Sequence, residues 1–348
     1  SSLVAEHLKL HNKEFIMQLL KNKLNTDLSD IREKVVDGHR LDYEDGIRLF
    51  ESSDILMIGS LANIVRERIN KNRAYYIINR HINYTNICKN RCKFCAFSRN
   101  IDEEGAYQMS IKEILDNASQ IIHDNSTELH IVGGLHPELG LDYYVDMIGS
   151  IHERFPDVHI QAFTAVEIAH FAEISGMSTY ETLEKLKDAG LSTLPGTAAE
   201  ILHDEIRQVI CADKINTEQW LEVMEEAHGL GFNTTATVMY GHVERTVHWA
   251  SHLIKIRDLQ KRTGGFTEFV PLPYVHMEAP MYLKGNSRAG PSFREAILMH
   301  SLARIVFHGL IENIQTSWVK MGKDGVFACL NAGANDIGGT LMNESITR

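Results

Sequence analysis

Asn86-Ile-Cys-Lys-Asn-Arg-Cys-Lys-Phe-Cys-Ala-Phe97 is the stretch that decides how the chain is interpreted. It holds three of the five cysteines, Cys88, Cys92 and Cys95, and it directly follows an extended-looking run over residues 74–84. Thiolates this close together in a short loop are badly placed for internal disulfides, whereas soft metals bind them well. The stretch therefore predicts a metal site at the end of a strand, occupied by zinc or by an iron–sulfur cluster.

The two remaining cysteines bear on the choice between these metals. A closed zinc site needs a fourth ligand, usually from a second Cys or Cys/His pair at a regular spacing downstream. Cys211 and Cys329 lie in helical patterns instead, as is typical of buried core residues. Three ligands favour a metal with an open coordination position, and a small zinc knuckle is the alternative.

The composition is that of an ordinary globular protein. With 348 residues, 44% of them hydrophobic and 23% charged, the chain is long enough for one barrel-sized domain or two smaller ones. A net charge of -11 and a pI near 5.9 argue against nucleic-acid binding. No apolar run is as long as a membrane span and no signal pattern opens the chain, so we expect a cytoplasmic protein that acts on a small molecule.

Residues 1–72 are expected to form an N-terminal helical extension. Apolar residues recur there at spacings of three and four, as at Phe15 and Leu19. Acidic candidates for helix N-caps are Asp27, Asp42 and Asp54. We expect this segment to cover the rest of the protein without a catalytic part.

Residues 73–348 alternate short β-rich runs with amphipathic helical runs. The expected strands are 74–85, 128–132, 159–164, 192–195, 234–240, 267–272, 313–319 and, weakly, 336–340. The expected helices are about 110–124, 142–155, 166–189, 199–230, 245–263, 292–308 and 322–332. Eight strands that alternate with helices are typical of a closed parallel (β/α)8 TIM-type barrel. An open doubly wound sheet is the alternative, because the last strand is weak and the first is long.

In such a barrel the chemistry lies at the C-terminal ends of the strands. Gly133 and Gly134 end the second expected strand and let the backbone approach a ligand. Hydrogen-bonding candidates at the ends of the third and fourth strands are Thr164, Glu167, Thr197 and Glu200. The two glutamates also have a structural explanation, because carboxylates stabilise the start of a helix.

The later strands carry more polar residues. Tyr240, His242 and Glu244 end the fifth strand, and a His and a carboxylate two apart in an extended segment share a face, which suits proton or ligand handling. The other candidates are Glu268, His276, Gln315, Ser317, Asn335 and Asp336. Polar residues that point into a barrel must be satisfied, either by a ligand or by an internal network. The loop over residues 272–292 is a candidate lid.

The spacing C-x3-C-x2-C, with Phe94 before the last cysteine, resembles the cluster loop of the radical S-adenosylmethionine (SAM) superfamily. The resemblance implies that Cys88, Cys92 and Cys95 hold a 4Fe-4S cluster, whose open iron binds SAM and whose reduction cleaves it to a 5'-deoxyadenosyl radical. The expected cofactor contacts are Phe94, Gly133, Gly134, Thr164 and Glu167. It also implies an electron donor such as flavodoxin or ferredoxin, and it leaves the oligomeric state open.

Further stretches resemble one group of that superfamily, which FO synthase shares with the futalosine-pathway enzymes of menaquinone biosynthesis. Pro195-Gly-Thr-Ala-Ala-Glu and Asn313-Ile-Gln-Thr-Ser-Trp resemble the 4-hydroxyphenyl transferase part of FO synthase. His130-Ile-Val-Gly-Gly and Ala162-Phe-Thr-Ala-Val-Glu resemble aminofutalosine synthase.

The resemblance in the C-terminal half leads us to expect a transferase that couples the 4-hydroxybenzyl fragment of L-tyrosine to 5-amino-6-(D-ribitylamino)uracil in FO biosynthesis. The alternative is an aminofutalosine synthase acting on 3-[(1-carboxyvinyl)oxy]benzoate, and a non-catalytic iron–sulfur protein is a remote one. The expected catalytic residues are His242, Glu244 and Glu268. The expected substrate contacts are Thr197, Tyr240, His276, Gln315, Ser317, Asn335 and Asp336.

Overall fold

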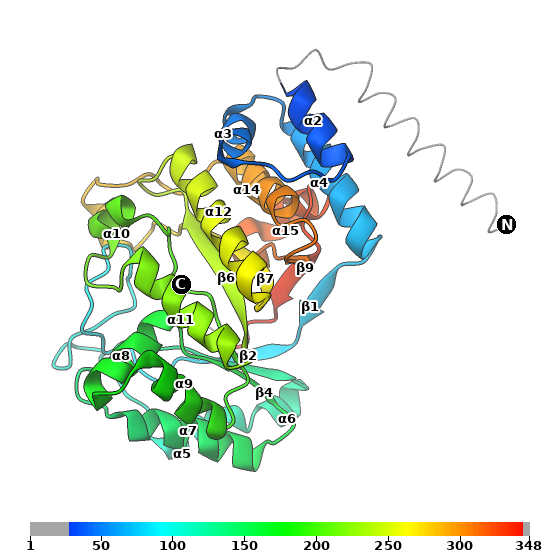
Figure 1. Cartoon of the computed structure of the whole chain (residues 1–348). Helices are drawn as coiled ribbons and strands as arrows, with labels where there is room; N and C mark the ends of the chain where they lie inside the picture. Colours follow the sequence, from blue (N-terminus) through cyan, green and yellow to red (C-terminus); the bar gives the residue numbers. More distant parts are fainter. Residues whose placement is uncertain (1–27, 344–348) are drawn as a thin grey trace.

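The computed structural model describes residues 28–343, in which short parallel strands alternate with helices (Figure 1). The strands are β1 (Tyr75–Ile77), β2 (Asn79–Ile82), β3 (Glu128–Ile131), β4 (His159–Ala162), β5 (Thr193–Leu194), β6 (Asn233–Tyr240), β7 (Phe266–Pro273), β8 (Asn313–Ile314) and β9 (Asp336–Gly339). Strands β2 to β8 form one sheet in chain order, and each neighbouring pair is parallel. Parallel neighbours require the long helical crossovers that the sequence pattern indicates.

Strand β9 closes this sheet into a barrel. It pairs in parallel with β1, and Thr316 N, just after β8, donates to Asp336 O at 2.8 Å. At the opposite edge, His81 N of β2 donates to Met342 O at 2.8 Å. The C-terminal segment thus lies between the last and first strands of the sheet. The expected (β/α)8 barrel is confirmed, and the open doubly wound sheet is wrong.

The two faces of the sheet differ in chemistry. On β3 and β4 the residues that face the helices are apolar and fully buried: Leu129, Ile131, Ile160 and Ala162. The alternate residues face the barrel interior and are polar: Glu128, His130, His159 and Gln161. Side chains of a strand alternate between its two faces, so a hydrophobic layer under the helices and a polar interior arise from one sequence pattern.

Helices surround the barrel (Figure 1). They are α5 (Ile111–Ala118), α6 (Ile121–Asp124), α7 (Leu141–Arg154), α8 (Ala165–Ser175), α9 (Thr179–Asp188), α10 (Asp204–Ile210), α11 (Thr217–Gly229), α12 (Thr246–Thr263), α13 (Pro280–Leu283), α14 (Phe293–Val306) and α15 (Trp318–Leu330). Three expected helices are each split in two; α8, for example, ends at Ser175 and is followed by Gly176, whose φ of 66° stops a helix. Within residues 28–343, no helix combines the length and the apolar content of a membrane span.

Three helices precede the sheet: α2 (Ser29–Val36), α3 (Tyr43–Glu51) and α4 (Ile55–Asn70). They pack beside α12 and α14 (Figure 1). Asp42 and Asp54 cap α3 and α4 as expected, accepting backbone N–H groups at 2.9 and 3.0 Å. Asp27, Phe15 and Leu19 lie outside the described residues. That residues 1–72 form a unit apart from the barrel stays a prediction.

Two expected strands are wrong in extent. The first is two strands, because the chain leaves β1, which pairs with β9, before it enters the main sheet as β2. The seventh ends at Ile314, because Ser317 is the N-cap of α15. Gln315 and Ser317 therefore do not alternate along a strand. The weak last strand is confirmed as β9.

Candidate active site

The cysteine loop lies directly after β2, at the C-terminal mouth of the barrel. Its backbone is bonded to three other segments: Lys89 N donates to Leu135 O at 2.9 Å, Lys93 N to Ile210 O at 2.8 Å, and Met281 N to Lys93 O at 2.7 Å. Cys88, Cys92 and Cys95 are free and half-buried. Three thiols on one fixed loop, reachable from solvent, fit a cluster that takes three thiolate ligands.

The described residues contain one group of side chains close enough to share a single ion, and it is His203, Glu205 and His248. The three loop cysteines are not such a group, which agrees with a wider cluster rather than with one zinc ion. His248 Nδ1 accepts a hydrogen bond from Arg245 N at 3.0 Å, so the other ring nitrogen carries the proton of the neutral imidazole. That ring is therefore poorly set to ligate a metal.

Lys214 is a largely buried cation beside the cysteine loop that the sequence patterns did not identify. Its ammonium group lies 2.6 Å from Glu200 Oε1 and 5.2 Å from the centre of the Phe94 ring. Burial lowers the pKa of Lys214, but the acidic groups Cys92, Glu200 and Cys211 outweigh it and raise the pKa overall. A fixed positive charge next to Cys92 suits a loop that must hold an anionic group.

Gly133 and Gly134 follow β3 as expected, and the cysteine loop needs them small. A Cβ on Gly133 would lie 2.7 Å from the Tyr84 ring, and one on Gly134 would lie 2.8 Å from the carbonyl carbon of Ile87. Both distances are shorter than the contacts that Cβ atoms make in proteins. The glycine pair therefore lets the end of β3 pack against the base of the loop.

Glu167 joins the ends of three strands. One carboxylate oxygen accepts from Tyr84 Oη at 2.7 Å and from Gly133 N at 3.1 Å, and the other accepts from Thr164 N at 2.7 Å. Thr164 returns the bond by accepting from Glu167 N with its hydroxyl oxygen, which completes the N-cap of α8. Burial raises the pKa of Glu167, with these hydrogen bonds opposing. Both residues thus hold the Gly133 turn in place.

The turn after β5 is strained, and it contains an unpaired hydroxyl. Ala198 and Glu200 have φ angles of 68° and 49°, which non-glycine residues rarely adopt. Thr197 Oγ1 is buried and has no hydrogen-bond partner. Strain next to an unsatisfied buried group is common where a ligand binds, so Thr197 stays a candidate.

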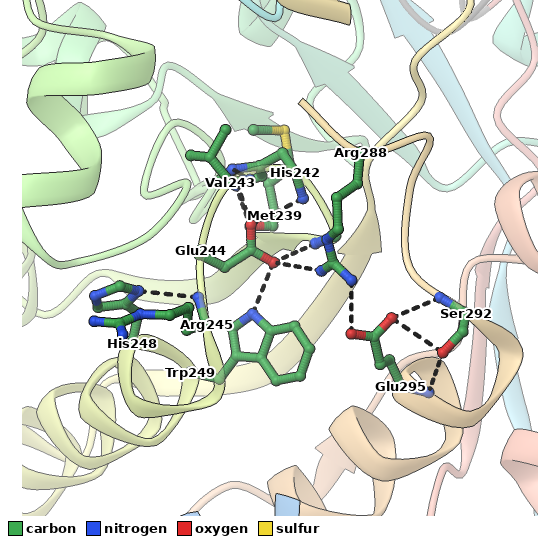
Figure 2. Close-up of polar contacts among 11 residues, drawn as sticks. Met239, His242, Val243, Glu244, Arg245, His248, Trp249, Arg288, Ser292 and Glu295 are labelled. Carbon is green, nitrogen blue, oxygen red and sulfur yellow. Dashed lines mark hydrogen bonds and ion pairs between the residues drawn. The ribbon is translucent and has the colours of Figure 1, made fainter. Parts of the chain in front are cut away.

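His242 and Glu244 lie together, but their polar atoms are used within the protein (Figure 2). Glu244 lies 2.9 Å from His242 Nδ1 and accepts from Trp249 Nε1 at 2.9 Å, and His242 Nε2 lies 3.1 Å from Met239 O. Burial raises the pKa of Glu244, but the bond to His242 and the other hydrogen bonds outweigh it and lower the pKa to about 2. Val243 N also donates to His242 Nδ1 at 2.8 Å, so both polar side chains are occupied by contacts that hold the local structure.

This pair anchors the loop over residues 272–292. Arg288 N donates to His242 O at 3.0 Å, and its guanidinium group bridges Glu244 and Glu295 at 3.7 and 2.8 Å (Figure 2). The same loop contains α13, whose Met281 bonds to the cysteine loop. The expected lid, which follows β7, thus contacts both the end of β6 and the cysteine loop, so it lies across the mouth.

The expected substrate residues lie in different surroundings. Tyr240 packs against Trp249 under the helices, and Asn335 is fully buried, with its amide bonded to Arg304, Ile314 N and Asn313. His276 stacks edge-on against Tyr282 in the mouth loop. Gln315 lies against Gly338, and Ser317 caps α15. Asn335 therefore has structural surroundings, whereas the hydroxyl of Tyr240 is buried and has no hydrogen-bond partner.

Glu268 faces the barrel interior, as a candidate substrate or catalytic residue should. A register shift between β6 and β7 adds one residue, Thr267, so Phe266 and Phe269 both face the helices while Glu268 faces inward. Burial and the nearby carboxylates Asp336 and Glu128 raise the pKa of Glu268 well above its ordinary value. Burial also raises the pKa of Asp336, to about 6.

Two family models match the chain: "Radical SAM superfamily" over residues 82–254 and "CofH/MqnC C-terminal region" over residues 263–348. A 5-amino-6-(D-ribitylamino)uracil--L-tyrosine 4-hydroxyphenyl transferase of Methanocaldococcus jannaschii is 43% identical over 326 residues, which is 92% of this chain and 89% of that protein. The chain belongs to the radical SAM superfamily, in the FO synthase group. The cofactors expected from the sequence, a 4Fe-4S cluster and SAM, are those of this superfamily.

Three further comparisons concern one relative and two solved structures. The FO synthase of Mycobacterium leprae is 46% identical over 84% of this chain but only 34% of its own length, so the chain spans about a third of that protein. Methylornithine synthase has the same fold, with a TM-score of 0.70, 19% identity, and coverage of 91% of this chain and 88% of that one. The hydrogenase maturase HydG of Carboxydothermus hydrogenoformans also has this fold, with a TM-score of 0.69 and 18% identity. The match covers 95% of this chain and 74% of that one.

Proposed function

We propose that this radical SAM enzyme couples the 4-hydroxybenzyl fragment of L-tyrosine to 5-amino-6-(D-ribitylamino)uracil, a step of FO biosynthesis. The name of the Methanocaldococcus jannaschii relative supports this reaction, since that relative aligns over nearly all of both chains. The C-terminal family match supports it over the last part of the barrel.

The inward carboxylates Glu128, Glu268 and Asp336 are the structural observation that carries the proposal. The charged groups that act on Glu268 are both carboxylates. The enolpyruvyl benzoate of the alternative reaction carries two carboxylates of its own. The pKa of Asp336, about 6, leaves this residue ionised at pH 7, and a second negative charge 4 Å from it costs about 4 kcal/mol at an effective dielectric constant of about 20. The uncharged ribitylaminouracil, rich in hydroxyl and amino donors, meets acceptors instead. The interior thus favours the transferase.

The cofactors are assigned to the mouth of the barrel. Cys88, Cys92 and Cys95 would hold the cluster, and Gly133, Thr197 and Lys214 are the residues we expect SAM to contact beside it. When bound, the two supply a 5'-deoxyadenosyl radical made by one-electron cleavage. The chain's own part is to orient the substrates and to exclude water, and the loop over residues 272–292 lies where it would do so.

An electron must reach the cluster from outside, so we propose a small one-electron carrier, such as flavodoxin or ferredoxin, as a partner. We also propose a cytoplasmic location, because all five cysteines are free thiols and a reducing compartment keeps them so.

The test is a product assay. Reconstituted enzyme is incubated without oxygen with SAM, dithionite, L-tyrosine and ribitylaminouracil, and products are identified by mass. The proposal predicts 5'-deoxyadenosine together with a coupled hydroxybenzyl–uracil product, and neither from Cys92→Ala. Adenosylation of the enolpyruvyl benzoate, with no coupling of tyrosine, would replace the proposal with aminofutalosine synthase.

A further inference from the structure

The barrel interior contains two stacked layers of polar residues below the mouth. The register of β2, β3 and β4 aligns Asn79, Glu128 and His159 in the lower layer and His81, His130 and Gln161 in the upper one. Glu268 and Asp336 approach Glu128 from β7 and β9, since both Asp336 and Glu128 act on the charge of Glu268. We call Glu128, Glu268 and Asp336 the carboxylate layer.

The carboxylate layer has more acceptor atoms than the protein supplies donors for. Asn79 Nδ2 donates to Glu128 at 3.1 Å and Gly338 N to Asp336 at 2.6 Å. Within residues 28–343 no partner for the Glu268 carboxylate is found, although its side chain retains solvent-accessible surface. Asp336 is likewise only partly buried. The interior is therefore not filled at this point, and it offers unpaired oxygen atoms to whatever enters.

His81 gives a second, independent indication of a ligand. The residue is only 8% exposed, and neither ring nitrogen has a hydrogen-bond partner. It stacks on His130 with ring centres 4.5 Å apart, and His130 lies 2.7 Å from Gln161. Burial lowers the pKa of His81 to about 2, so the ring is neutral and has one donor and one acceptor. A hydroxyl group, which donates and accepts, satisfies such a ring.

The depth of the layer limits the shape of the ligand. Glu268 lies five residues before Pro273, the last residue of β7, which corresponds to roughly 16 Å along a strand at about 3.3 Å per residue. The chemistry takes place at the mouth, beside the cysteine loop. A substrate that reaches both must be long, with a reactive group at one end and hydroxyl groups at the other. An open-chain polyol joined to a uracil ring has this shape, whereas tyrosine does not.

We propose that His81, Glu268 and Asp336 bind the ribityl chain, so that the uracil ring is presented upward to the mouth of the barrel. The inference rests on the proposed function and adds the orientation of the substrate to it. The carboxylates accept hydrogen bonds from the chain's hydroxyl groups, and His81 both donates and accepts. Tyrosine then occupies the space between the uracil ring and the cofactors.

Calorimetric titration of the reconstituted enzyme with SAM present tests this orientation. The ligands are 5-amino-6-(D-ribitylamino)uracil and 5-amino-6-methylaminouracil, which lacks the polyol. Wild type should bind the full ligand at least about 100-fold more tightly than the truncated one. Glu268→Gln and Asp336→Asn should each weaken binding of the full ligand about 10-fold and leave the truncated ligand within about 2-fold, because each replaces a carboxyl oxygen that bonds the polyol with an amide nitrogen.

Three controls keep the outcomes separate. Glu153 is exposed on α7, and Glu153→Gln should change neither affinity. His81→Phe keeps an aromatic ring but no polar atom, and it probes the same binding of the polyol if a carboxylate variant fails to take up iron. Equal loss of affinity for both ligands in the variants, or equal wild-type affinity for both, would overturn the orientation. Absence of the coupled product in the wild-type assay would instead overturn the proposed function.

Discussion

Gly133→Ala should destabilise the mouth of the barrel, and the structure fixes the size of the effect. The new Cβ would lie 2.7, 2.8 and 2.9 Å from three atoms of the Tyr84 ring, where ordinary contact begins at 3.4 Å. A shift of about 0.7 Å is needed, and the ring cannot give way easily. It is fully buried, packs against Tyr144 and Phe163, and is held by Glu167 at 2.7 Å. Overpacking of this kind costs about 1–3 kcal/mol.

Urea unfolding of the reconstituted enzyme measures this loss, and SAM titration should show weaker binding in parallel. Gly149→Ala is the matched control, because it lies within α7 with nothing within 4 Å of its Cβ and should gain about 0.5–1 kcal/mol. A smaller residue at position 84 should relieve the clash. The double variant Gly133→Ala with Tyr84→Leu should therefore lose at least about 1 kcal/mol less free energy of unfolding than the two single variants lose in sum. Wild-type stability and SAM affinity in Gly133→Ala alone would refute the reasoning.

Three further predictions concern buried polar groups. The pKa of Asp336 is raised from 3.8 to about 6, so the folded state holds the carboxyl proton more tightly than the unfolded state does. The stability that this group contributes is therefore fully present below about pH 4 and declines as the pH rises through about 6. Unfolding at about pH 5 and pH 7.5 should show about 1 kcal/mol of this decline, and Asp336→Asn should abolish it. Glu244→Gln should lower the free energy of unfolding by roughly 2–3 kcal/mol above about pH 5 and make the loop at Arg288 sensitive to trypsin. The pKa of Glu244, lowered to about 2, means that the folded protein stabilises the ionised carboxylate, and this stabilisation weakens only as the pH falls from 4.5 towards 2. Unchanged proteolysis would show that the loop is anchored elsewhere. Asn335→Leu should cost about 3 kcal/mol by removing the side-chain acceptor of the buried Arg304, while kcat/KM of the folded fraction stays at the wild-type value; a selective fall in kcat/KM would return Asn335 to the substrate site.

The cysteine loop and the alternation of strands and helices could be predicted because both are local. Thiol spacing and apolar periodicity need no knowledge of distant segments. The predicted seventh strand is too long because Ser317 is the N-cap of a helix. A polar cap residue at this spacing looks the same in the sequence as the next polar residue of an alternating strand. The polar alternation of Asn79 and His81 along the first strand is a signal of an inward face that the sequence prediction did not use.

Other parts of the site depend on contacts between distant segments. Lys214 belongs to the site only because the cysteine loop is bonded to the end of α10. The inward direction of Glu268 depends on the extra residue Thr267 in β7, which strand periodicity cannot reveal. His242 and Glu244 resemble a proton-handling pair in the sequence because their spacing does not show that Trp249 and Arg288 occupy the carboxylate.

Competition between the two substrate sets in one reaction tests the central claim most directly. The enzyme receives SAM, ring-13C-labelled L-tyrosine, ribitylaminouracil and the enolpyruvyl benzoate together, under reducing and oxygen-free conditions. The acceptor-rich interior predicts that the label appears in a hydroxybenzyl–uracil product while the benzoate is recovered unchanged. Consumption of the benzoate to an adenosylated product, with no label transferred to the uracil, would contradict the account.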